Sequence, residues 1–170
     1  MSVESLFLQC SVEKLGQFVD RIEVCLGRLT EDQLWARGQA NENAVGNLVL
    51  HLAGNVRQWI LSSLGGQPDH RDRDAEFAAR AGVTSGELSG RLRDTVKQAA
   101  QIISGLSTAQ LTNTYEIQNY RVSGVQAVYH VVEHFAQHTG QIIFATKMLT
   151  GEDLGFYRHL RNPAHQELVP

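Results

Sequence analysis

Three histidines in this chain have the residue type and the spacing that a transition-metal site needs. His134 and His138 are four residues apart, and His51 lies in a separate, earlier segment. On an α-helix, side chains four residues apart project from one face, with about 6 Å between them along the axis. One helix can therefore supply two imidazole nitrogens to an ion, and a facing helix the third. Three imidazoles leave a coordination position open, and an open position allows chemistry on a bound molecule.

A fourth histidine extends the pair into a ladder, because His130 precedes His134 by the same step of four residues. A helix drifts by about 40° at each such step, so only two consecutive members can face one ion well. The spacing alone does not distinguish the 130/134 pair from the 134/138 pair. The residues after His138 favour the second pair. Gly140 leaves room for a close approach, and Gln141 lies one turn beyond His138, where it could form a hydrogen bond inside the pocket.

Long amphipathic segments are expected to position these residues. Apolar residues recur every three or four positions, as on the buried face of a helix, over the ranges 3–28, 44–64, 85–105 and 124–149. Capping boxes at Thr84 and Ser123 mark the last two starts, and Asn43 is expected to cap the second helix. Residues 114 to 122 alternate and are rich in β-formers, which favours a small hairpin. We therefore predict one all-α domain over residues 1–170, a four-helix bundle with long connections and a small hairpin.

Two further segments are predicted to lie outside the site. Residues 67–83 contain the charge-dense run Asp69-His70-Arg71-Asp72-Arg73-Asp74 and are interpreted as a solvated connection, with a helical turn near residues 75–80. The tail, residues 152–170, is predicted to be irregular with a turn at Asn162-Pro163. His70, His159 and His165 fall in these segments and are expected to be ordinary surface side chains.

The composition argues against several classes of protein. A length of 170 residues suits one domain with a core that needs no disulfide. A formal net charge of -3, without a run of basic and aromatic residues, gives no support to nucleic-acid binding. No stretch approaches the roughly twenty apolar residues that span a bilayer, and no signal peptide is recognised, so we expect a cytoplasmic protein. Cys10 and Cys25 lack a metal or redox spacing and are expected to be buried core thiols.

Two motifs resemble those of the DinB superfamily of four-helix-bundle metalloproteins, which includes YfiT-like metal-dependent hydrolases. The motifs are Asn47-Leu-Val-Leu-His51-Leu-Ala-Gly-Asn55 and His134-Phe-Ala-Gln-His138-Thr-Gly-Gln141-Ile, and the resemblance extends over roughly residues 3 to 150. It implies that His51, His134 and His138 bind a divalent ion, typically nickel or zinc. His130 lies outside the matched positions and is interpreted as lining the pocket. Asn55 and Gln141 are expected to offer polar contacts to a small-molecule substrate.

The resemblance leaves three function hypotheses. The first is a thiol S-transferase, in which a metal-activated low-molecular-weight thiol attacks an electrophile. The resemblance implies it, because relatives include S-transferases that use bacillithiol or mycothiol and thiol-dependent maleylpyruvate isomerases. A metal-dependent hydrolase is the second hypothesis, but Glu133 projects about 100° away from His134 and does not suit the general base. A non-catalytic metal-binding bundle is the third, although a structural zinc site normally has four protein ligands. Family relatives often dimerise through helix faces, so a homodimer is expected.

Overall fold

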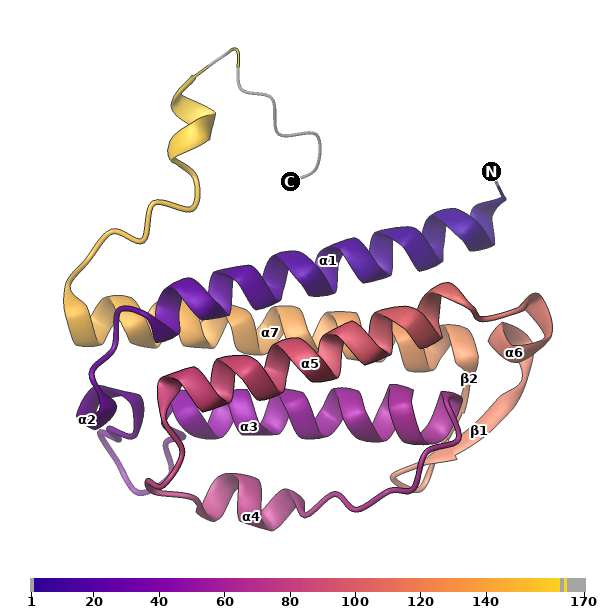
Figure 1. Cartoon of the computed structure of the whole chain (residues 1–170), viewed down its shortest axis with the longest axis horizontal. Coiled ribbons are helices and arrows are strands. Elements are labelled where there is room, and N and C mark those ends of the chain that lie inside the picture. Colours follow the sequence, from indigo (N-terminus) through magenta and orange to yellow (C-terminus); the bar gives the residue numbers. More distant parts are fainter. Residues whose placement is uncertain (1, 163, 165–170) are drawn as a thin grey trace.

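The structure is a computed structural model that describes residues 2–162 and 164. In this part of the chain, four long helical segments pack side by side (Figure 1). α7 packs against α1 and α3, and α5 packs against the same two helices. This arrangement confirms the predicted all-α bundle. The segments are α1 Val3–Leu26, α3 Val45–Val56 with its continuation η1 Arg57–Leu64, α5 Ser85–Ser104 and α7 Gly124–Thr150.

Short elements connect the long helices. The predicted hairpin is confirmed, with Thr114 opposite Ser123 and a two-residue turn at Gln118 and Asn119. Both turn residues have positive φ angles, 51° and 63°, as a tight hairpin turn requires. The short elements are α2 Glu31–Leu34, α4 Arg73–Ala78, α6 Thr108–Thr112, β1 Thr114–Ile117, β2 Tyr120–Ser123 and the 3-10 helix η2 Arg158–Arg161.

Over its described residues up to Asn162, the tail contains the short helix η2 within an otherwise irregular path. The predicted turn at Asn162-Pro163 falls partly, and His165 wholly, outside the described residues. No helix of the described chain is both long and apolar enough to cross a membrane.

The predicted capping boxes position two of the long helices. Gln126 N donates to Ser123 Oγ over 3.2 Å, and Ser123 N donates to Gln126 Oε1 over 2.8 Å, so α7 begins where its sequence indicates. The box at Thr84 starts α5 in the same way.

The predicted cap of the second helix was wrong. Ala44, not Asn43, is the N-cap residue of α3, and it has no side-chain acceptor. The Asn47 side chain caps the helix start in another way, because its Oδ1 accepts a hydrogen bond from Ala44 N over 3.1 Å. The other end of the Asn47 amide donates to the backbone oxygens of Glu76 and Ala79, both over 2.9 Å. A single side chain thus starts α3 and fastens α4 to it.

The last 8 residues of the predicted helix 44–64 form a π-helix, η1. Its wider hydrogen-bonding pattern is seen at its end, where Gly65 N donates to Ile60 O over 2.8 Å. The helix ends at the residue expected, but its last turns have a different periodicity from the α-helix that the apolar spacing predicted.

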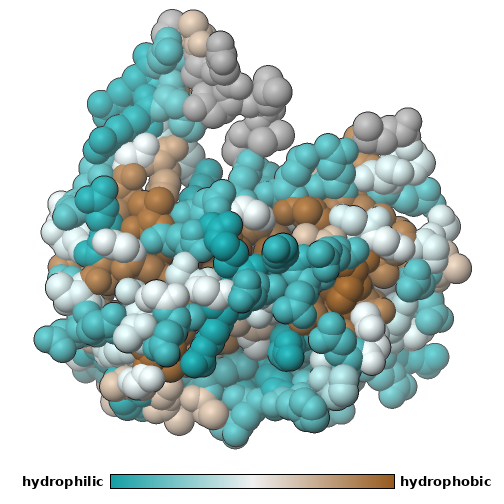
Figure 2. Space-filling view, in the orientation of Figure 1, coloured by the Kyte–Doolittle hydropathy of each residue, from teal (hydrophilic) through white to brown (hydrophobic). Residues whose placement is uncertain are grey.

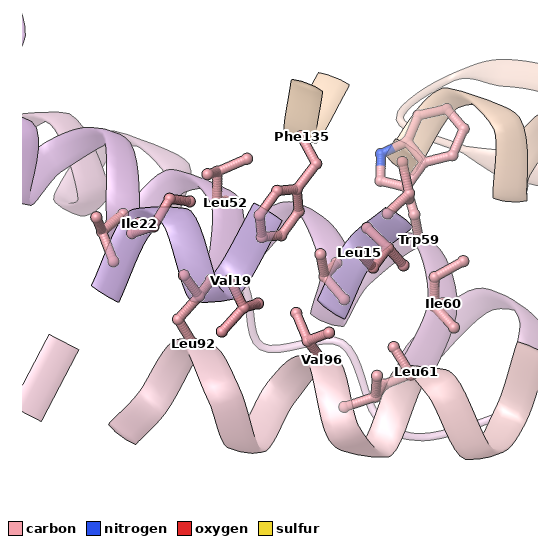
Figure 3. Packing of buried hydrophobic residues seen from close by; sticks show 14 of the residues in the cluster. Leu15, Val19, Ile22, Leu52, Trp59, Ile60, Leu61, Leu92, Val96 and Phe135 are labelled. Atoms are coloured by element: carbon pink, nitrogen blue, oxygen red, sulfur yellow. The ribbon is translucent and has the colours of Figure 1, made fainter. Parts of the chain in front are cut away.

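The core lies between the four long helices. Phe135 extends from α7 toward Leu15 and Val19 of α1 and Leu52 of α3 (Figure 3). All four of these side chains are buried. The face of the molecule shown in Figure 2 is mainly hydrophilic, with hydrophobic side chains visible between the polar ones.

One cysteine prediction holds and the other does not. Cys25 is buried in the core, but Cys10 is exposed. Leu8 and Ser11 occupy the inward positions of this part of α1. A residue next to Ser11 is turned by about 100° around the helix, which directs Cys10 outward.

The connection predicted for residues 67–83 is largely exposed and contains a short helix close to the predicted turn, but it is not solvated throughout. α4 forms inside it and packs against α3. The side chains of Arg71 and Glu76 are only 3% and 10% exposed, because they neutralise each other against the bundle. Arg71 and Glu76 are therefore part of the fold, whereas the other charged residues of the segment are exposed, and α4 brings the Glu76 carboxylate to the predicted site.

Candidate metal centre

The structure brings the three predicted histidines together. One nitrogen from each of His51, His134 and His138 lies within 4.8 Å of the others. The shortest separation is 2.8 Å, between His51 Nε2 and His134 Nε2. His51 comes from α3 and is 5% exposed, whereas the other two come from α7 and are half-buried. Three imidazole nitrogens this close together could bind one divalent ion.

The packing separates His130 from this cluster. Its ring lies on that of Trp59, with 3.9 Å between centroids, and stacks on His134 at 5.4 Å. The ring centroids of His134 and His138 lie 5.0 and 5.1 Å from the ring centroid of His51. The 134/138 pair therefore faces His51, and His130 lies one turn away, against Trp59.

Two of the three candidate ligands form a hydrogen bond at the nitrogen that faces away from the cluster. His138 Nδ1 lies 2.6 Å from Gln141 Oε1, and His51 Nδ1 lies 3.0 Å from Glu76 Oε2. A polar partner at Nδ1 orients an imidazole and leaves Nε2 for a metal. Gln141 thus contacts a candidate ligand through Oε1, and the substrate contact expected of it stays a prediction.

Asn55 lies one turn beyond His51 and is 3% exposed. Its Oδ1 is buried without a hydrogen-bond partner, and so is the Nε1 of Trp59, one turn further along. A buried polar atom left unpaired costs about 1–3 kcal/mol, so such atoms in a native fold call for an explanation. Both side chains lie on the stripe of α3 and η1 that carries His51, as positions four residues apart must.

Glu76 and Arg71 were not predicted to take part in the site. Arg71 Nε donates to Glu76 Oε1 over 2.8 Å, and Arg71 Nη2 donates to Glu76 Oε2 over 2.9 Å. Burial raises the pKa of Glu76, but hydrogen bonds and charge from Arg71 and His51 outweigh it and hold that pKa below its ordinary value. Phe77, the next residue, packs its ring 4.7 Å from that of His51. No spacing in the sequence relates Glu76 to His51, because the contact depends on how α4 folds against α3.

The electrostatics favour neutral imidazoles. Burial, the largest cause, and the charges of the neighbouring His138, His51, His130 and Arg71 together lower the pKa of His134 to about 3. Burial also lowers the pKa of His138, against an opposing hydrogen bond with Gln141. Neutral imidazole is the form that binds a metal, so these ligands stay available at physiological pH.

The metal-free protein is expected to lose stability as the pH falls below about 6.5. Unfolded histidines take up protons near that pH, whereas folded His134 does so only near pH 3. Each such histidine contributes a slope of at most about 1.4 kcal/mol per pH unit. Urea unfolding with a chelator present, at pH 7 and pH 5.5, measures the loss. His134→Ala should lose less stability over this interval, and an equal loss in both proteins would contradict the assignment.

The fold and the histidine cluster define a class, that of helical-bundle proteins with a candidate three-histidine metal centre. The chain belongs to the DUF1572 family, described as proteins of unknown function, whose model matches residues 2–162. Among solved structures, it is similar to a conserved protein from Enterococcus faecalis, with a TM-score of 0.71 and 18% sequence identity. The similarity covers 89% of this chain and 99% of that one, and at this identity it shows the fold alone. A comparison with curated proteins gave no match.

The family description gives no function. Membership of the DinB superfamily, which the two histidine motifs predict, stays a prediction.

Proposed function

We propose that this protein is a metal-dependent enzyme, and that it transfers a low-molecular-weight thiol to an electrophilic substrate. His51, His134 and His138 would hold one nickel or zinc ion. The observation that carries the proposal is the composition of the cluster, because no carboxylate or thiol of the described residues joins the three imidazoles. A tetrahedral ion held by three protein ligands has a position left for an outside molecule. When bound there, the ion would lower the pKa of a thiol and favour its nucleophilic thiolate form.

The surroundings of the cluster favour a thiol transferase over a hydrolase. A metal-dependent hydrolase usually has a group beside the ion that takes a proton from the attacking water. Glu76 contacts the far nitrogen of His51, and its lowered pKa leaves it a poor proton acceptor. Glu133 is exposed. A thiol that has already lost its proton needs no such base.

The unpaired atoms of Asn55 and Trp59 also support an organic ligand beside the cluster. Asn55 Oδ1 can accept a hydrogen bond, and Trp59 Nε1 can donate one. Low-molecular-weight thiols carry amide and hydroxyl groups that can pair with both. Such pairing would satisfy two atoms that the fold leaves without partners.

The proposal predicts metal-dependent consumption of thiol. Nickel- or zinc-loaded protein is mixed with glutathione or cysteine and with 1-chloro-2,4-dinitrobenzene. The thiol sulfur bonds to the ring carbon, chloride leaves, and the thiol proton passes to solvent. We expect the absorbance of the thioether product to rise faster than in the uncatalysed mixture, and we expect His51→Ala to abolish this acceleration. His70→Ala, which removes an exposed histidine outside the cluster, is the matched control and should keep full activity.

The same samples separate the competing functions. Hydrolysis of p-nitrophenyl acetate without any thiol, lost in His51→Ala, would favour the hydrolase instead. If fully metal-loaded protein consumes neither thiol nor ester, the enzyme proposal gives way to a non-catalytic metal-binding bundle.

A further inference from the structure

We propose that Glu76 and Arg71 form a positioning pair, which fixes the orientation and tautomer of His51, and that Gly54 provides the space this pair needs. The inference rests on the proposed metal centre and adds residues to it that neither motif indicated. Glu76 would act through His51 without touching the ion itself.

The Arg71–Glu76 ion pair is buried, and a buried ion pair with a purely structural role would add little to the stability of the fold. The Arg71 and Glu76 side chains are 3% and 10% exposed, and two hydrogen bonds of 2.8 and 2.9 Å join them. Removing two charges from water costs about as much as their attraction returns, so burial of an ion pair does not by itself stabilise a fold. The third contact of Glu76, 3.0 Å to His51 Nδ1, gives the pair a role.

The charges of the two neighbouring groups favour one position for the proton of His51. His51 Nδ1 is 3.0 Å from Glu76 Oε2 and 3.1 Å from Arg71 Nη2. An ionised carboxylate only accepts and a guanidinium only donates. Arg71 Nη2 donates one N–H to Glu76 Oε2, and its second N–H could donate to a bare Nδ1. That arrangement would leave the Nδ1 lone pair 3.0 Å from the lone pairs of the ionised Glu76 Oε2, which disfavours it. With the proton on Nδ1, His51 donates to Glu76, and the lone pair of Nε2 points to His134 and His138.

Gly54 makes the approach of the carboxylate possible. It follows His51 by three residues and so lies on the same side of α3. A Cβ at this position would overlap Glu76 Oε1 and lie 3.0 Å from Arg71 Nε. Alanine at 54 should therefore push the pair away from His51 without changing a charge, a ligand or a hydrogen-bonding group.

The backbone that carries Glu76 is held independently of its side chain. Asn47 Nδ2 donates to the backbone oxygens of Glu76 and Ala79, and Arg37 Nη2 donates to Phe77 O over 2.9 Å. These contacts remain when the carboxylate is altered. Substitution of the Glu76 side chain should then change the contact with His51 while α4 stays against α3.

The tautomer can be read in the wild-type protein without any variant. Long-range proton–nitrogen NMR correlation of the metal-free protein should show His51 with its proton on Nδ1 and a bare Nε2. Glu76→Gln puts an amide beside Nδ1 that can donate to it, so the population should shift toward a proton on Nε2. A His51 with its proton on Nε2 in the wild-type protein would overturn the proposal.

Zinc affinity tests the consequence for the site. Competition with a chromophoric chelator should show Glu76→Gln and Gly54→Ala binding Zn²⁺ about 10–100-fold more weakly than the wild type, the loss typical of outer partners of metal ligands. Gly90→Ala is the matched control, because a Cβ at that exposed helical position meets nothing within 4 Å. Wild-type affinity in both test variants would overturn the positioning role. A wild type that binds no Zn²⁺ would refute the metal centre instead, and the NMR result would still decide what fixes His51.

Discussion

Replacing His134 with alanine is expected to remove the bound metal and to leave the bundle folded. The substitution takes away one of three ligands, and loss of outer partners alone lowers metal affinity by about 10–100-fold, so we expect a fall of more than about 100-fold. The fold should survive because a chain of 170 residues buries a core that does not depend on an ion. Metal analysis of protein purified without a histidine tag measures the first effect, and circular dichroism the second.

The matched control for this substitution is His130→Ala. His130 is on the same helix and one turn away, but it packs against Trp59 outside the cluster. It should keep bound metal. If His130→Ala loses the ion and His134→Ala retains it, the ligand assignment is wrong.

Phe135→Ala, at the residue after His134, should lower the stability of the fold and leave the metal ligands in place. Phe135 is fully buried and stacks with Phe18 at a centroid distance of 6.0 Å. Truncating a core phenylalanine leaves a cavity and typically costs about 3–5 kcal/mol. Urea unfolding of the metal-free protein at neutral pH should show this loss in the free energy of unfolding.

The two neighbours thus separate stability from metal binding. Under conditions where Phe135→Ala remains folded, it should still bind metal, because its three histidines are intact. A cost below about 1 kcal/mol would mean that α7 does not insert Phe135 into the core as described. The cluster, which depends on the same helix rotation, would then also be in doubt.

Local patterns in the sequence were enough to predict the long helices. Apolar residues spaced by three or four positions identify the helix faces, and the boxes at Thr84 and Ser123 set two starts. The histidine cluster could be predicted for the same reason. Its two members on α7 are fixed relative to each other by helix geometry, and only the arrival of His51 required a tertiary contact.

Features that depend on tertiary contacts escaped prediction. Glu76 reaches His51 because α4 folds onto α3, and the buried Arg71 finds its partners, Glu76 and Gln58, only in the folded chain. A run of charges in a sequence is usually solvated, so the pattern pointed the other way. The start of α3 was predicted at Asn43, but the Asn47 side chain caps it and also donates to the backbone of α4, a contact that no local pattern indicates.

X-ray absorption spectroscopy of tag-free, zinc-loaded protein can show directly whether His51, His134 and His138 bind one ion. We predict one ion per chain, with three imidazole nitrogens at about 2.0–2.1 Å and a fourth ligand from outside the protein, a water oxygen when no thiol is present. Adding glutathione should replace the fourth ligand with sulfur at about 2.3 Å. The imidazole signal should be lost in His51→Ala. No retained zinc, or an unchanged spectrum in that variant, would contradict the account.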